Sequence, residues 1–169
     1  MKGQISFVEY LVAMTIFITF SVYFFYYLMS FLPNYLNQLE SERIRSEAYQ
    51  ISEMLINDPG EPTNWYLNPN NAKRIGFSDE NFNQTNLLSL DKINAIGIAC
   101  TIGYKKIKKL IGSDLDFSII LRKKPSNNVL LACVPLSSPT KVTNVTIRRI
   151  VSINTPAGLE LGELILQVW

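Results

Sequence analysis

The side chains that could carry out acid–base, nucleophilic or metal chemistry are few in this sequence. The chain has no histidine, which is the commonest general acid or base and the commonest metal ligand. The best candidates for an acid–base pair are four carboxylates, whose spacing matches no catalytic motif: Asp114, Asp116, Glu160 and Glu163. We therefore expect neither an enzyme nor a bound metal or cofactor.

The two cysteines, Cys100 and Cys133, are too far apart in the chain for a CxxC metal or redox motif. If this part of the chain lies outside the cell, the two can pair as a disulfide, and closing the loop between them would stabilise the fold by about 3–4 kcal/mol. The alternative is two buried thiols, because free cysteine packs as a small apolar residue. The sequence leaves both interpretations open.

Charge and glycosylation signals point to no particular partner. The net charge of +2 is too small to indicate nucleic acid as a partner. Lys105, Lys106, Lys108 and Lys109 lie together, either as an anion-binding patch or as the solvated face of a helix. Asn83 and Asn144 each begin an Asn-x-Thr glycosylation sequence, and Asn144 falls within a predicted strand.

The remaining chemistry-bearing residue, Glu9, stands at the start of a long apolar run. No charged residue occurs between Glu9 and Glu40. A helix rises about 1.5 Å per residue, so residues 10–32 would span roughly 30–35 Å, the thickness of a bilayer core. A carboxylate at the edge of such a segment marks either a functional partner or a position among lipid headgroups. The run predicts a transmembrane or filament-core helix over residues 4–35.

The residues in front of the apolar run carry a more specific signal. The chain begins Met-Lys-Gly-Gln-Ile-Ser-Phe-Val-Glu-Tyr, which resembles the class III signal peptides of archaeal type IV pilin-like proteins: a Lys-Gly pair, then Gln-x-Ser, then Glu-Tyr. The resemblance implies that a prepilin peptidase cuts between Gly3 and Gln4, leaving residues 1–3 as a short leader. It also implies that Glu9 pairs with the N-terminal amine of a neighbouring subunit. Glu9 is the sixth residue after the expected cut, whereas the family usually has this Glu fifth.

Beyond the apolar run the pattern changes from uniformly apolar to amphipathic. Apolar residues recur every three or four positions over residues 36–57, which predicts a helical segment lying on a soluble domain. Asp58-Pro59-Gly60 ends the helix, and a loop with Trp65 and Tyr66 follows. Residues 58–169 should then form one extracytoplasmic head domain.

Within the head, two short helices should precede a sheet. The helices are expected at residues 86–96, with Ser89 as N-cap, and at residues 104–111, ending at Gly112. Four runs rich in β-branched residues follow, separated by turn residues, and predict strands: residues 116–122, 129–134, 141–153 and 159–169. We expect an α+β fold in which a long N-terminal helix packs on an antiparallel meander of about four strands, as in pilins.

These expectations combine into one functional hypothesis and one alternative. The resemblance implies a structural subunit, major or minor, of an archaeal type IV pilus-like filament. Such a subunit would be a membrane precursor first and part of a cell-surface filament after assembly. Its partners would be copies of itself or related pilins, the prepilin peptidase and the membrane assembly machinery. The alternative is a single-pass, membrane-anchored binding or sensor domain that never polymerises.

Overall fold

One helix, α1 (Lys2–Asn57), makes up the first third of the chain and is continuous through Pro33. The computed structural model describes residues 2–81, 84–135 and 144–169, with the backbone alone at residues 2–6 and 102. By their internal contacts the residues form two compact units, Met1–Glu40 and Ser41–Trp169, so α1 contributes to both. We refer to the second unit as the head.

The C-terminal part of α1 belongs to the head because one of its faces is buried there. Ile44, Ala48, Ile51 and Leu55 follow one another at spacings of four and three residues, and each is at most 5% exposed. This spacing places them on a single side of the helix, in the core that also holds the inner face of the sheet. The helix ends at Asn57, and the turn that follows needs Gly60, whose φ is +85°.

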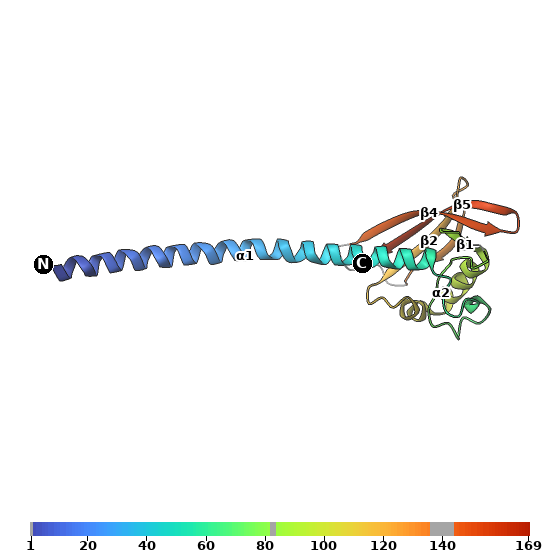
Figure 1. Cartoon of the computed structure of the whole chain (residues 1–169), viewed down its shortest axis with the longest axis horizontal. Coiled ribbons are helices and arrows are strands. Elements are labelled where there is room, and N and C mark those ends of the chain that lie inside the picture. The colour runs from blue at the N-terminus through green and yellow to red at the C-terminus, as the bar shows by residue number, and fades with distance from the viewer. Residues whose placement is uncertain (1, 82–83, 136–143) are drawn as a thin grey trace. The chain divides into compact units, whose positions relative to one another are not determined.

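The head sheet has five strands in the order β1-β4-β5-β2-β3, and Figure 1 shows β4 and β5 as a long hairpin. Its strands are β1 (Leu87–Ser89), β2 (Phe117–Lys123), β3 (Val129–Cys133), β4 (Val145–Thr155) and β5 (Gly158–Val168). Alternate residues of the strands point into the core, for example Leu164, Leu166 and Val168 of β5, all fully buried. The expected α+β class, with a long N-terminal helix packed on a sheet, is confirmed.

The predicted meander order is wrong. A meander would pair β3 with β4, but β5 lies between β4 and β2 and pairs antiparallel with both. The apolar residues of β5 suit a central strand, and three of its side chains are completely buried. Gly162 of β5 leaves room for the Ile153 side chain of β4, since an added Cβ would lie 2.7 Å from Ile153 Cδ1.

The helix predicted at residues 86–96 is also partly wrong. Leu87–Ser89 form the short strand β1, which pairs parallel with β4 and makes the sheet mixed. Ser89 is at the N-cap position of α2 (Leu90–Ile111), although its side chain makes no capping hydrogen bond. The two predicted helices are one element with a kink at Gly103, ending as expected at Gly112, whose φ of +76° is left-handed.

Candidate functional site

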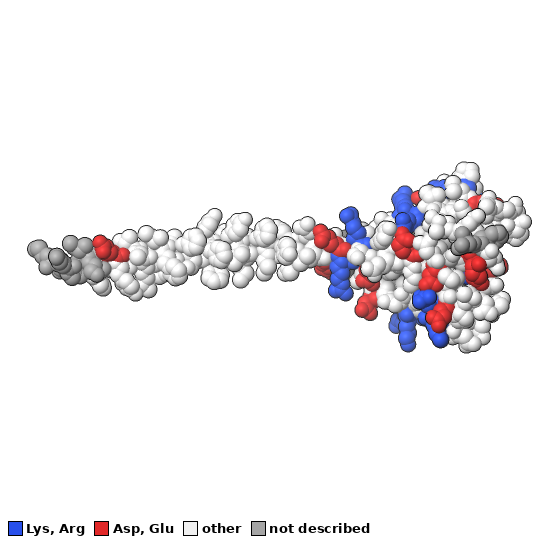
Figure 2. Space-filling model, viewed as in Figure 1, with Lys and Arg blue, Asp and Glu red and all other residues white. Residues whose placement is uncertain are grey.

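The first unit presents an uncharged helical surface that nothing in the described structure covers. Every side chain from Phe7 to Glu40 except Ser21 is exposed, and none between Glu9 and Glu40 is charged. Figure 2 shows this surface as an uninterrupted white stretch of helix. Soluble monomers rarely expose apolar patches above a few hundred Å². This helix is long and apolar enough to cross a membrane, and its surface requires either lipid or protein as a cover.

The few hydroxyl groups on this surface are satisfied within the helix. Thr15 Oγ1 donates to the Leu11 carbonyl at 2.8 Å, and Thr19 Oγ1 donates to the Thr15 carbonyl at 2.8 Å. Ser30 Oγ donates to the Tyr26 carbonyl at 3.0 Å. Polar groups that bond to their own backbone can enter an apolar environment without leaving a donor unpaired. The surface is therefore compatible with both lipid and a neighbouring helix.

Aromatic side chains form a stripe along one side of the surface. The stripe consists of residues that recur every three or four positions: Phe17, Phe20, Phe24, Tyr27, Phe31 and Tyr35. Neighbours in it stack, with ring centroids 6.3 Å apart for Phe20 and Phe24 and 6.3 Å apart for Tyr27 and Phe31. The stripe was not among the features predicted from the sequence, where the run was described as uniformly apolar, although its spacing of three and four residues is visible there.

The residues of the predicted leader and Glu9 lie at the beginning of the same helix. Gly3 and Gln4 fall within α1, where the structure describes the backbone only. The side chain of Glu9 is exposed and makes no ion pair with any side chain that the structure describes. A carboxylate at the end of an uncharged surface is available for a partner outside this chain.

The cysteines of the head are joined. Cys100 of α2 and Cys133 of β3 form a disulfide, with Cα atoms 5.6 Å apart. Both residues are buried, Cys133 completely. The bond fastens α2 to an edge strand of the sheet, so of the two interpretations left open by the sequence, the structure has the disulfide.

The four carboxylates considered for catalysis do not converge. Asp116 accepts from Lys108 Nζ at 2.8 Å, and Glu160 accepts from Lys123 Nζ at 2.6 Å. Glu163 is paired with Lys124 at 2.9 Å. The Lys124 hydrogen bond holds the pKa of Glu163 below its usual range. Glu160 and Glu163 are three residues apart on β5 and so point to opposite faces of the sheet, and Asp114 is exposed.

The most deeply buried ionic group of the head has a structural role. Lys92 is 1% exposed, and its ammonium donates to the carbonyls of Pro59 at 2.9 Å and Ser78 at 2.8 Å and pairs with Glu80. Lysine has three donors, so all of them are used. Within the described residues no group of acidic, cysteine and histidine side chains could hold a metal ion.

The remaining sequence signals are placed as follows. Lys106 and Lys108 of the lysine cluster have partners inside the head, at Asn70 and Asp116. Asn144 is exposed and directly precedes β4, so its predicted position inside a strand is wrong. Asn83 lies outside the described residues.

The head also holds an apolar cavity of about 410 Å³ between the 3₁₀ helix η1 (Trp65–Leu67) and α2, which we call the η1–α2 pocket. This pocket could not be predicted from local sequence patterns, because its two walls are about 30 residues apart in the chain. No protein-family model matches this chain, and neither the curated proteins nor the solved structures gave a significant match.

Proposed function

We propose that this chain is a structural subunit, major or minor, of an archaeal type IV pilus-like surface filament. It is made as a membrane precursor, cut between Gly3 and Gln4 by a prepilin peptidase, and polymerised through its N-terminal helix. The observation that carries the proposal is the helical surface that follows the predicted leader: its side chains are exposed from Phe7 to Glu40 except at Ser21, and none between Glu9 and Glu40 is charged.

The uncharged surface supports both states that the proposal requires. In the precursor, the surface faces lipid, and the absence of charge between Glu9 and Glu40 permits insertion. In the filament, the same surface faces the helices of neighbouring subunits. Lipid and apolar side chains are similarly apolar, so packing shape and polar pairing decide the arrangement. The aromatic stripe gives the helix a distinct surface shape for packing against neighbouring helices. Glu9 provides a polar group that can pair with the N-terminal amine of a neighbour.

The alternative is a membrane-anchored binding or sensor domain that does not polymerise. The observation in its favour is the η1–α2 pocket, because a purely structural subunit has no need of a cavity in its head. The leader argues against it, because a plain anchor has no use for a cleavage signal in front of the helix.

Replacement of Gly3 tests the proposal. In a Gly3→Val variant we expect the chain to keep Met1, to remain in the membrane and to form no filament, because the branched side chain blocks the cleavage site. Lys2→Arg is the matched control, since it keeps the basic residue of the leader and should be processed normally. N-terminal sequencing and electron microscopy of sheared cell-surface material measure both results. Normal filaments from the Gly3→Val variant would overturn the proposal.

A further inference from the structure

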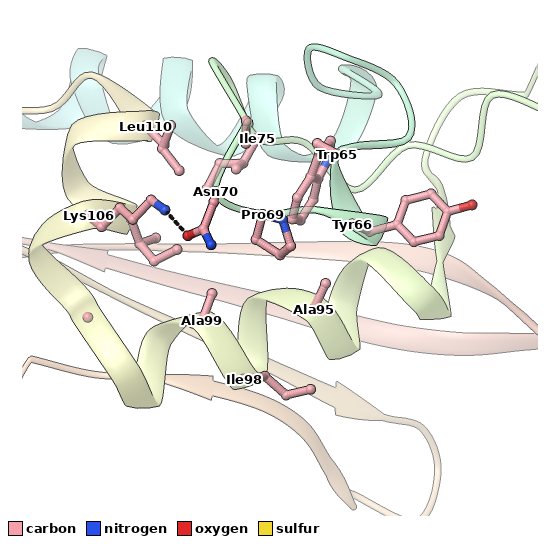
Figure 3. A pocket seen from close by; sticks show the side chains of 13 residues that line it. Trp65, Tyr66, Pro69, Asn70, Ile75, Ala95, Ile98, Ala99, Lys106 and Leu110 are labelled. Atoms are coloured by element: carbon pink, nitrogen blue, oxygen red, sulfur yellow. Dashed lines mark hydrogen bonds between the residues drawn. The ribbon is translucent and has the colours of Figure 1, made fainter.

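The η1–α2 pocket has mostly apolar walls. One wall includes Ala95 and Ala99 of α2, whose small side chains point toward η1 in Figure 3. Gly103, which has no side chain, also lines the pocket on the α2 side, and we call the space along these three residues the trough. The opposite wall includes Trp65, which is 1% exposed. Its indole Nε1 donates to the carbonyls of Pro59 at 3.2 Å and Gly76 at 3.3 Å, so the indole offers the trough only its apolar atoms. The volume of about 410 Å³ is within the roughly 300–1,000 Å³ usual for small-molecule sites.

The polar groups of the pocket lie together, and the groups left free are donors. Lys106 Nζ donates to Asn70 Oδ1 at 2.7 Å, as the dashed line in Figure 3 shows. Because lysine has no acceptor, this bond fixes the amide of Asn70 with its oxygen toward Lys106. The Asn70 amide nitrogen and the remaining ammonium hydrogens are then left for an acceptor. The hydroxyl of Tyr66 points away from the pocket in Figure 3 and adds nothing there.

The charge at the pocket is positive. Lys106 is the single charged residue among the described residues that line it, and no described carboxylate faces it. Lys105 and Lys109, both exposed, add positive charge on the same stretch of α2. An apolar trough with donors and positive charge at one place is complementary to a molecule with an apolar body and a single anionic acceptor.

We propose that the η1–α2 pocket binds a small amphiphilic monocarboxylate. Its hydrocarbon body lies in the trough between Trp65 and the Ala95-Ala99-Gly103 wall. Its carboxylate accepts hydrogen bonds from Lys106 Nζ and the Asn70 amide. This site is independent of filament assembly, and its test does not depend on the function proposed above.

Octanoate, octanol and octylammonium are suitable probes, because they share one chain and differ in the charge of the head group. The full-length protein is reconstituted in lipid nanodiscs with ¹³C-labelled alanine methyl groups. Ala95 and Ala99 then report on the pocket, Ala13 on partition of the probe into the membrane around α1, and Ala48 on the integrity of the core. We expect octanoate to shift Ala95 and Ala99 saturably and more tightly than either other probe does, with Ala48 unchanged.

Variants separate the role of charge from that of shape. Lys106→Gln should weaken octanoate binding by about two- to fivefold, the range for an exposed ion pair, and should leave octanol binding unchanged. Lys109→Gln is the matched control, because it removes the same charge from the same helix outside the pocket lining. Ala99→Leu should fill the trough and abolish the octanoate shift at Ala95 while Ala48 stays in place.

Two outcomes would overturn the assignment. Shifts confined to Ala13 would show partition into the membrane and no site in the head. Equal affinities for the three probes, or equal effects of Lys106→Gln and Lys109→Gln, would show that the pocket does not select an anion.

Discussion

At the scale of single residues, the head is held by buried polar groups that bond across long sequence separations. Asp79 is 5% exposed and accepts from Asn154 Nδ2 at 2.9 Å and from the Asn81 backbone amide at 3.1 Å. Burial alone would raise the pKa of Asp79. The hydrogen bonds from Asn154 and Asn81, together with the Lys92 charge, outweigh burial and lower this pKa. Asp79 thereby links the loop before β1 to the end of β4.

The lowered pKa of Asp79 predicts a pH-dependent contribution to stability. A carboxyl group with a lower pKa in the folded state stabilises the fold above its unfolded pKa of about 3.9, and loses this effect as the pH falls through the folded pKa. Asp79→Asn should therefore lower the free energy of unfolding by about 1–3 kcal/mol at pH 7. The difference between the two proteins should shrink as the pH falls below about 4.

Urea unfolding of the full chain, followed by tryptophan fluorescence across the pH range, measures this difference. Asp114→Asn is the matched control, because Asp114 is exposed, and it should change stability little at any pH. A constant destabilisation by Asp79→Asn from pH 7 to pH 3 would contradict the assignment of charge-dependent bonding to Asp79.

The disulfide makes a second prediction at this scale. It closes a loop across a sequence separation of 33 residues, which on the chain-entropy model stabilises the head by about 3–4 kcal/mol. Dithiothreitol should lower the melting temperature of the wild-type protein. The Cys100→Ala/Cys133→Ala variant should melt at the lower temperature with or without reductant. A wild-type melting temperature that does not respond to reduction would argue against this contribution.

At the scale of elements, α1 changes its role along its length. Between Tyr10 and Leu39 its apolar side chains are exposed, whereas Ile44, Ala48, Ile51 and Leu55 are buried in the head core. The change coincides with the return of charged residues at Glu40. Arg149 of β4 pairs with Glu53 of α1 and lies over the Tyr49 ring, 4.9 Å from its centroid, so polar contacts reinforce the apolar packing there.

Truncating one leucine on each part of α1 should have different effects. Leu55 is 0% exposed, so Leu55→Ala removes core contacts and should destabilise the head by about 2–5 kcal/mol. Leu36 is 55% exposed, so Leu36→Ala is the matched control and should leave the unfolding of the head unchanged. Urea unfolding detected at Trp65 and Trp169 compares the two. Equal destabilisation by both variants would contradict the division of α1.

The strands illustrate what local patterns can and cannot predict. Runs rich in β-branched residues, separated by turn residues, placed β2 to β5 close to their observed bounds, because composition and turn signals are local properties of the sequence. The order of the sheet, predicted as a meander, was wrong. The pairing of β5 with β2 and β4 depends on contacts between residues far apart in the chain, such as Ile119 with Leu166. Strand β1 was missed because three residues, Leu87 to Ser89, are too few to show a period.

The same distinction applies to the candidate sites. The uncharged surface of α1 could be read from the sequence, because one uninterrupted helix displays it. The η1–α2 pocket could not be read, because Asn70 and Lys106 are 36 residues apart and meet through the fold. The lysine cluster was visible in the sequence, but only the structure shows that Lys106 lies at the pocket and Lys108 pairs with Asp116.

At the scale of the whole molecule, the two units present different features. The first unit supplies an uncharged helical surface that must be covered by lipid or by other helices. The head supplies a disulfide-bonded α+β domain with a pocket of its own. The proposed subunit uses the first surface twice, in the membrane and then in the filament, and cleavage between Gly3 and Gln4 separates the two states.

The most direct test of this account is the N-terminal sequence of the protein recovered from cell membranes and from sheared surface material. The account predicts a mature chain that begins at Gln4 and is present in the sheared fraction. An intact Met1, recovered from the membrane fraction alone, would contradict the filament proposal and favour the membrane-anchored binding domain.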